Sequence, residues 1–469
     1  MKKRNSHCCT MLLRQCAVFF FCFLLVPGYG FGKDSTVSVP KGTVMTLNEA
    51  IAVALKSNRS LQRSRLSLAS SNLNVQLQKD TFDIKVLPAS SVNYNASDDK
   101  YWSAGLTFFK KTELGISGSI TPKIEEIAGT TRASVNLMLN VPLLRGLGTE
   151  YNLDGLHGSL YALETARRAH YKQQDNLIIS TVTTVYGVIN LQKQIDLLQT
   201  QVEGLKKHIL LTEVKEKTGL ASAMDMYRAE LRLKEVQNQL TVLEKQFETN
   251  VDRLKNLLGS SMQNDLIVAA PIEYQPITIH LDKAVDIALK NRIEIEQAVR
   301  RSEEAKRKVA IARHDILPMI DFRLDYKKYD KSDSDYLDDE DWAVSLNGSS
   351  ELFRSAARTA YEQAKISFQQ SKIEIESSRE DIIREVRAQI NQMHKKEQLI
   401  VDRRKQLRQA QGKLELALSK FNHQLADNFD LLEAQTQKQQ VETDLLFDTI
   451  GYIIDTYKLR STLGTLIAR

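Results

Sequence analysis

The sequence predicts an α+β membrane protein in which long coiled-coil helices adjoin a β-barrel that several chains share. Three observations support this: two long stretches without proline, segments of alternating apolar and polar residues, and a pattern that occurs nearly twice along the chain. Of the 469 residues, 42% are hydrophobic and 26% are charged, so the chain is not disordered. No stretch after residue 30 has eighteen consecutive apolar residues, which excludes a bundle of membrane-spanning helices.

The first 32 residues have the pattern of a secretory signal peptide. Basic residues 2–4 precede an apolar run at 17–26, and small residues follow, so we expect cleavage after Gly30 or Gly32. A retained amphipathic anchor is the alternative. All four cysteines lie in this segment, so the mature chain can form no disulfide and no thiolate metal site. Cys22 lacks the small preceding residue of a lipid-modified cysteine, which disfavours a lipoprotein.

Charge and motifs exclude several functional classes. Loss of the signal peptide lowers the net charge from +6 to +2, so no nucleic-acid partner is expected. The mature histidines are scattered without the spacing of a zinc helix. No phosphate-binding loop or nucleophile motif occurs, and residues 146–148 lack the third glycine of a dinucleotide site. We therefore expect no enzyme, no cofactor and no metal.

The chain repeats its own pattern. Three pairs of segments match: 46–59 with 280–292, 222–230 with 427–435, and 253–259 with 458–464. The offset is 234 residues at the first pair and 205 at the others, so the first copy carries about 29 extra residues. We expect two structural repeats, at 33–262 and 263–469. Their strands are expected at about 86–141 and 320–350, and their long helices at about 152–258 and 353–463.

Each repeat is expected to open with a short helix after Thr46 or His280. A longer helix follows, and we expect it to stop at Pro88 or Pro318, because proline interrupts helices. The proline-free stretches 143–270 and 319–469 leave room for much longer helices. The second of these has apolar residues every seven positions, as a coiled-coil seam does: Val386, Met393, Ile400, Leu407, Leu414 and Phe421.

Segments with a period of two alternate apolar and polar residues. They lie at 102–108, 133–141, 320–326 and 342–346, with a weaker set at 114–120. A soluble sheet packed on helices would show the same alternation. Charges on the polar face, flanking tryptophans and tyrosines, and export favour a membrane barrel instead. Because one chain has too few strands for a roomy barrel, several chains would have to share one.

The chain resembles the TolC-type outer-membrane efflux and secretion channel family over residues from about 45 to 467. The matching segments are 47–55 and 281–289 (Leu-x-x-Ala-x-x-x-Ala-Leu), 141–145, 219–225 and 430–435. The resemblance implies a homotrimer with four membrane strands per chain, closed into one twelve-stranded barrel. It also implies a periplasmic α-helical barrel that tapers to a closed mouth, below the outer membrane of a Gram-negative-type bacterium.

The same resemblance implies a function without catalysis. Such proteins are passive exit ducts of tripartite efflux pumps or type I secretion systems. Their partners are copies of the same chain, a periplasmic adaptor, an inner-membrane transporter and outer-membrane lipid. A periplasmic adaptor or an exported structural coiled-coil protein is the alternative. Two full repeats with paired strand blocks argue against both alternatives.

Two acidic residues are candidates for the periplasmic mouth. The resemblance places an acidic ring at Asp430 and Glu433, one helical turn apart on one face. Threefold symmetry would bring six carboxylates to one constriction and favour cations. The alternative is a solvated helix start, where Asp430 favours the N-terminal dipole. Gln424 and Ala426 depart from the family pattern, so the closing contacts are expected to differ.

Two further segments, 101–121 and 330–341, lie among the expected strands. Residues 101–121 contain two extra strand-like segments, which we expect to form an extracellular hairpin beyond the barrel. An eighteen-stranded barrel with six segments per chain is the alternative. Residues 330–341 include seven acidic residues and no glycine, so they are expected to form an exposed loop rather than a calcium loop. Weak binding of divalent cations or lipopolysaccharide is the alternative there.

Overall fold

The computed structural model describes residues 44–468 with short gaps, at 95–99, 128–129, 220–221, 262–265, 331–336, 338, 352, 354, 424 and 426–427. The predicted signal peptide, and most of the acidic segment 330–341, therefore lie outside the described residues.

Both halves of the chain contain a short strand, two helices, longer strands and two long helices in that order, and the first half also contains a 3-10 turn, two further strands and a four-residue helix. The first half contains β1 (Val44–Thr46), α2 (Leu47–Ser57), α3 (Arg59–Lys79), the 3-10 turn η1 (Asp80–Phe82), β2 (Lys85–Tyr94), β3 (Lys100–Lys111), β4 (Ser117–Ile127), β5 (Thr130–Pro142), α4 (Thr149–Asn152), α5 (Asp154–Lys217) and α6 (Ala223–Leu258). The second contains β6 (Ile267–Ala269), α7 (Leu281–Asn291), α8 (Ile293–Asp315), β7 (Met319–Tyr329), β8 (Asp339–Ser349), α9 (Ser355–Asn422) and α10 (Asn428–Thr462).

Local sequence sets the ends of the helices. Thr46 and Glu49 form a capping box at the start of α2, which satisfies two backbone N–H groups that have no partner within the helix. Gly259, with φ of 64°, ends α6 in the left-handed conformation that glycine adopts at low cost. The expectation that α3 extends to Pro88 is wrong. It ends at Lys79, because the 3-10 turn η1 follows, and Pro88 lies in β2.

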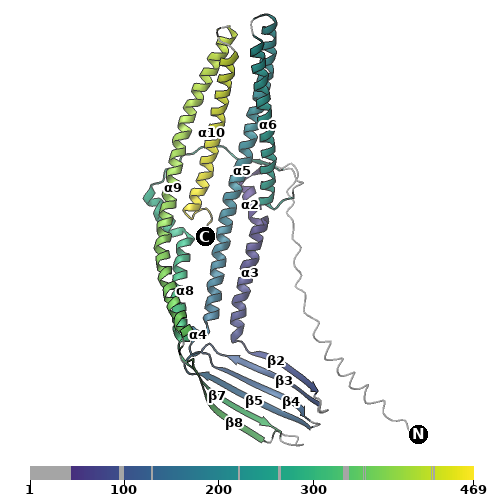
Figure 1. Cartoon of the computed structure of the whole chain (residues 1–469), viewed down its shortest axis with the longest axis vertical. Helices are drawn as coiled ribbons and strands as arrows, with labels where there is room; N and C mark the ends of the chain where they lie inside the picture. Colours follow the sequence, from purple (N-terminus) through teal and green to yellow (C-terminus); the bar gives the residue numbers. More distant parts are fainter. Residues whose placement is uncertain are drawn as a thin grey trace, which may run out of the picture. The chain divides into compact units, whose positions relative to one another are not determined.

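The long helices form two antiparallel hairpins, α5–α6 and α9–α10 (Figure 1). The 64 residues of α5 span about 96 Å at 1.5 Å per residue. The largest apolar core joins α2, α5, α6 and α10, with Val182, Val185 and Leu254 fully buried. A second core joins α7, α9 and α10 and contains Val386 and Ile400 of the predicted seam. Among the described residues, no helix is both long and apolar enough to cross a membrane.

Six strands form one antiparallel sheet in the order β2-β3-β4-β5-β7-β8. The expectation that residues 101–121 form a hairpin apart from the other strands is therefore wrong. They belong to β3 and β4, which lie between β2 and β5 and pair with both. The chain contributes six strands to the sheet rather than four. Pairing in register places most of the large apolar residues of the six strands on one face.

One face of the sheet is apolar and the other is polar. Register places one apolar residue of each strand in a single row, formed by Val86, Phe108, Ile120, Leu137, Tyr326 and Trp342. On the other face, the Lys123 ammonium pairs with Glu125 at 2.5 Å, and the Ser91 and Ser103 hydroxyl oxygens are 2.9 Å apart. The alternation predicted at 102–108, 133–141, 320–326 and 342–346 lies in β3, β5, β7 and β8.

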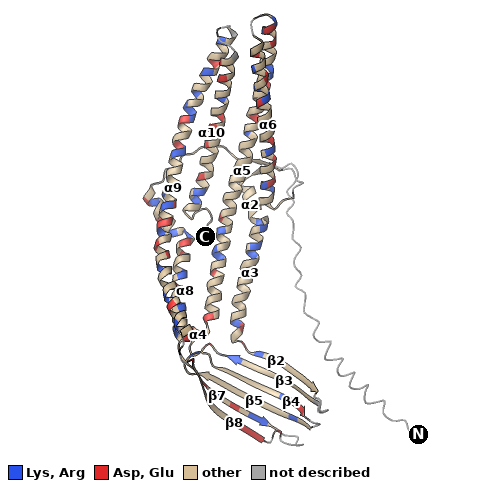
Figure 2. Cartoon of the chain, viewed as in Figure 1, with Lys and Arg blue, Asp and Glu red and all other residues tan. Residues whose placement is uncertain are grey.

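The apolar face is the more exposed of the two in β3. Leu106 and Phe108 are 43% and 39% exposed, whereas Ser103, on the polar face, is 8% exposed. Within the described part of the chain, no helix covers either face of the sheet (Figure 1). Figure 2 shows charged residues along the helices, whereas much of the sheet carries none. A folded domain in water buries its apolar face, so this sheet needs an apolar environment outside the chain.

Candidate functional site at the ends of the helical hairpins

Both helical hairpins end in a turn at the end of the long helices away from the sheet (Figure 1). At the first turn, α6 begins with a capping box in which the Ser222 hydroxyl donates to the Asp225 carboxylate at 2.6 Å. The Asp225 backbone N–H in turn donates to the Ser222 hydroxyl at 3.3 Å. The Ser222 hydroxyl hydrogen bond holds the pKa of Asp225 below its usual range. This hairpin end is therefore capped by an ionised carboxylate.

Asp430 and Glu433 lie at the second turn. Asp430 is in the first turn of α10, where the positive end of the helix dipole stabilises a carboxylate. Both side chains are exposed, and one helical turn separates them on the same face. Gln424 and Ala426, which depart from the family pattern, lie outside the described residues.

A lysine that the sequence analysis missed partners one of these acids. The Lys413 ammonium, from α9, lies 2.8 Å from a Glu433 carboxylate oxygen and 3.0 Å from the Gln437 side-chain oxygen. Because both ionic side chains are about half exposed, the pair adds little stability. Its effect is on charge, since it offsets one of the two negative charges of the candidate acidic ring.

The hairpins contact each other near their ends through Phe421, the last apolar residue of the α9 seam. The Lys215 ammonium, from α5, lies 3.5 Å from the centre of the Phe421 ring and 3.4 Å from the Phe421 carbonyl oxygen. The His208 ring lies 5.4 Å from the same ring. Phe421 itself is buried among Ala417 and Leu431, between α9 and α10. A cation on α5 thus holds an aromatic ring that belongs to the core of the other hairpin.

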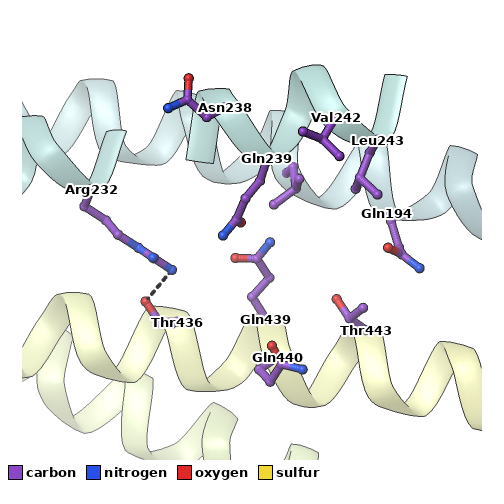
Figure 3. Close-up of a pocket in the computed structure, with 11 residues that line it drawn as sticks. Gln194, Arg232, Asn238, Gln239, Val242, Leu243, Thr436, Gln439, Gln440 and Thr443 are labelled. Atoms are coloured by element: carbon purple, nitrogen blue, oxygen red, sulfur yellow. Dashed lines mark hydrogen bonds between the residues drawn. The ribbon is translucent and has the colours of Figure 1, made fainter. Parts of the chain in front are cut away.

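A polar groove separates the two hairpins a little further from the turns. It lies between α6 and α10 (Figure 3). Its volume is about 630 Å³. Three apolar side chains, Leu198, Val242 and Leu243, line it together with five side-chain amides: Gln194, Asn238, Gln239, Gln439 and Gln440. One Arg232 Nη atom donates to the Thr436 hydroxyl at 3.0 Å, and the other binds Glu235 at 2.9 Å. The Arg232 Nε atom is buried and has no hydrogen-bond partner among the described residues.

Apolar packing near the turns is mainly internal to each hairpin. Leu198, Leu205 and Val236 form a cluster of α5 and α6, which Leu432 joins from α10. A separate cluster belongs to α9 and α10. Further along, one continuous core includes α5, α6 and α10 together. Apolar contact between the two hairpins is therefore smaller near the turns than in the middle of the helices.

Residues 284–465 match the family model described as "Outer membrane efflux protein". The matched segment lies in the second half of the chain and is similar to that family. No curated protein sequence matches the chain. The predicted resemblance to TolC-like channels is confirmed. Proteins of this family are outer-membrane channels with a periplasmic extension, which is the location predicted from the sequence.

Solved structures of outer-membrane channels share the fold over most of their length. The channel OprN has a TM-score of 0.69 at 17% identity, with 89% of this chain and 90% of that chain covered. VceC of Vibrio cholerae has a TM-score of 0.69 at 14% identity, with 89% and 96% covered. CmeC of Campylobacter jejuni has a TM-score of 0.69 at 14% identity, with 90% and 86% covered.

The efflux-protein family consists of conduits rather than enzymes, in agreement with the absence of catalytic motifs in the sequence. No group of three or more histidine, cysteine, aspartate or glutamate side chains that could hold a metal occurs in the described part of the chain. The residues that matter for a conduit are instead those that line it and those that hold its narrow end.

Proposed function

We propose that the chain is the outer-membrane exit duct of a tripartite efflux pump or type I secretion system. It acts as a homotrimer, and a periplasmic adaptor and an inner-membrane transporter open it. One observation carries this proposal: a six-stranded sheet with an uncovered apolar face continues into two long helical hairpins. The first long helix, α5, has 64 residues. Lipid can cover the apolar face, and the polar face then lines water.

The sheet supports an assembly of several copies rather than a channel in one chain. Six strands are too few to enclose a water-filled lumen, since eight give an interior that side chains fill. A periplasmic adaptor or a structural coiled coil would have no need of a sheet with one uncovered apolar face. Duplication of one ancestral unit, into repeats 33–262 and 263–469, accounts for the order of elements in the two halves.

In a trimer, the start of α10 would form the mouth of the duct. Three copies of Asp430, Glu433 and Lys413 supply six carboxylates and three ammonium groups, so the ring keeps a net negative charge. Such a ring favours cations. The mouth opens when α10 moves relative to α6, which replaces the Arg232–Thr436 contact across the polar groove with water. The adaptor and transporter supply the free energy for this movement.

Charge changes at the mouth test this proposal. We expect Asp430→Asn with Glu433→Gln to lower the preference of single channels for potassium over chloride in planar bilayers, because the ring loses its negative charge. Lys413→Gln removes the compensating cation of Glu433 and should raise the same preference. These three substitutions are nearly isosteric or shorten an exposed side chain, so they should leave assembly intact.

Reversal potentials in a salt gradient measure this preference for the purified mature protein. If selectivity is the same in all variants, Asp430 and Glu433 do not form the constriction, although the chain still conducts. If neither the wild type nor any variant conducts, the duct proposal itself fails.

A further inference from the structure

We infer that the outer-membrane wall of the assembly has eighteen strands, with β8 of each copy paired to β2 of the next. The inference rests on the homotrimer proposed above and concerns how its copies join. In the described sheet, β2 and β8 are the outer strands, and each has one unpaired edge. Lipid offers no hydrogen bonds, so a sheet whose apolar face lies in lipid must pair both edges. A second copy of the chain presents the complementary edge.

Strand direction allows this pairing. Every neighbouring pair in the sheet is antiparallel, and the chain contributes an even number of strands. Therefore β2 and β8 run in opposite directions, and β8 of one copy meets β2 of the next as an antiparallel neighbour. The apolar faces of the two strands can also be matched, because even-numbered residues of both strands lie on the apolar face, as Val86 and Trp342 do. A ring of identical copies can then close without a parallel junction.

Helices beside the two outer strands point to the same junction. α3 leads into β2, and α9 follows β8. On α3, Leu66, Leu73 and Leu77 are 66%, 68% and 62% exposed, at spacings that place them on one helix face. On α9, Ile366 and Ile373 are 53% and 70% exposed, seven residues apart. A second copy that pairs β8 with β2 would bring α9 beside the neighbouring α3 and cover both apolar stripes.

Aromatic residues at the end of the sheet away from the helices give the tilt of the strands. Tyr94 lies near that end of β2, and Trp342 lies near that end of β8. In the sheet, however, Trp342 is in the same row as Val86, and Val86 precedes Tyr94 on β2 by eight residues. Five strand spacings measure about 24 Å and eight residues about 26 Å. The aromatic residues form a level belt only if the strands tilt by roughly 45°, which is close to the tilt of closed barrels.

Polar tips of the aromatic belt support the same orientation. The Trp102 indole donates to Glu126 at 2.5 Å, and the Tyr326 hydroxyl donates to Glu340 at 2.9 Å. Aromatic rings with a polar partner on one side are typical of a membrane interface. The inferred wall therefore has a defined outer boundary. Because barrel diameter grows about linearly with strand number, its opening is about half as wide again as that of a twelve-stranded wall.

Engineered disulfides test the inference in the full-length protein, because the chain has no cysteine after residue 22. Two within-chain pairs report whether β3 and β4 remain in the wall: Ser91→Cys with Ser103→Cys, and Ser119→Cys with Met138→Cys. Each pair is directly opposite across two strands, within reach of a disulfide. The junction is tested by Ser345→Cys combined with Ala89→Cys or Ser91→Cys, in alternative registers. Ser345→Cys with Ser90→Cys is the control, because Ser90 lies on the other face.

We expect both within-chain bonds to form in outer-membrane preparations, and one of the junction pairs to give covalent trimers in non-reducing SDS gels. The control pair should give monomers. A bond between Ser91→Cys and Ser134→Cys, with both β3 and β4 pairs unbonded, would mean that β2 pairs with β5 in a twelve-stranded wall. That result overturns the inference but leaves the duct intact. Monomers in every variant, together with no conductance in bilayers, would overturn both.

Discussion

Replacement of Leu137 by lysine is expected to prevent stable assembly of the protein in the outer membrane. Leu137 lies in the centre of the apolar row, directly opposite Ile120 and Tyr326 on the flanking strands, and is 38% exposed. If lipid covers this face, a lysine near the midplane of the bilayer costs about 2–4 kcal/mol in each copy. A homotrimer has three such sites, so the total cost is comparable to the whole stability of a folded domain.

The neighbouring residue provides a matched control. Met138 follows Leu137 on β5 and lies on the polar face, opposite Ser119 and Asp325. Met138→Lys adds the same side chain to the surface that we assign to the lumen, opposite an acidic residue, and it should leave the amount of outer-membrane trimer unchanged. Fractionation and heat-dependent migration in SDS gels measure both variants. If Leu137→Lys assembles normally while Met138→Lys does not, the apolar face does not lie in lipid.

Asp455→Ala is expected to cause the largest loss of stability among the helix substitutions. Asp455 is 1% exposed in α10, and its carboxylate lies 2.7 Å from the Lys396 ammonium and 2.9 Å from the Gln392 side-chain nitrogen, both on α9. The Lys458 ammonium lies 3.5 Å from the other carboxylate oxygen. Removal of the carboxylate leaves these partly exposed donors without their shared partner, at a cost of about 2 kcal/mol.

An exposed ion pair on α9 is the control for Asp455→Ala. Lys405 and Asp402 are 3.6 Å apart, and both side chains are more than 60% exposed. Asp402→Ala should change stability by less than about 1 kcal/mol, because solvent screens the pair. Thermal unfolding of the purified protein in detergent compares the two variants. Equal shifts in the unfolding temperature would contradict the structural role of Asp455.

Local pattern predicts the elements well, because the signals lie within each element. The seven-residue spacing that includes Val386 and Ile400 corresponds to α9, where both residues are buried. Strand alternation likewise corresponds to β3, β5, β7 and β8. The place of residues 101–121 was not predictable in this way. Alternation is the same in a strand inside a sheet and in a separate hairpin, and only the pairing of β3 with β2 and of β4 with β5 decides between them.

The candidate site, too, could be predicted from the sequence only in part. Asp430 and Glu433 stand one helical turn apart in the sequence, so a family pattern can point to both. Their surroundings cannot be read in that way, because the partners are distant along the chain. Lys413 lies 20 residues from Glu433, and Arg232 lies 204 residues from Thr436. No local spacing indicates such pairs, and the antiparallel packing of the hairpins brings them together.

Single-particle imaging of the detergent-purified mature protein tests the central claim most directly, since the claim is that several copies share one duct. The account predicts a particle with threefold symmetry and a detergent belt around the strands. A helical tube of about 100 Å should extend to one side of the belt, given the length of α5. A compact or monomeric particle without a detergent belt would contradict the account, because the apolar face of the sheet would then be covered within a soluble protein.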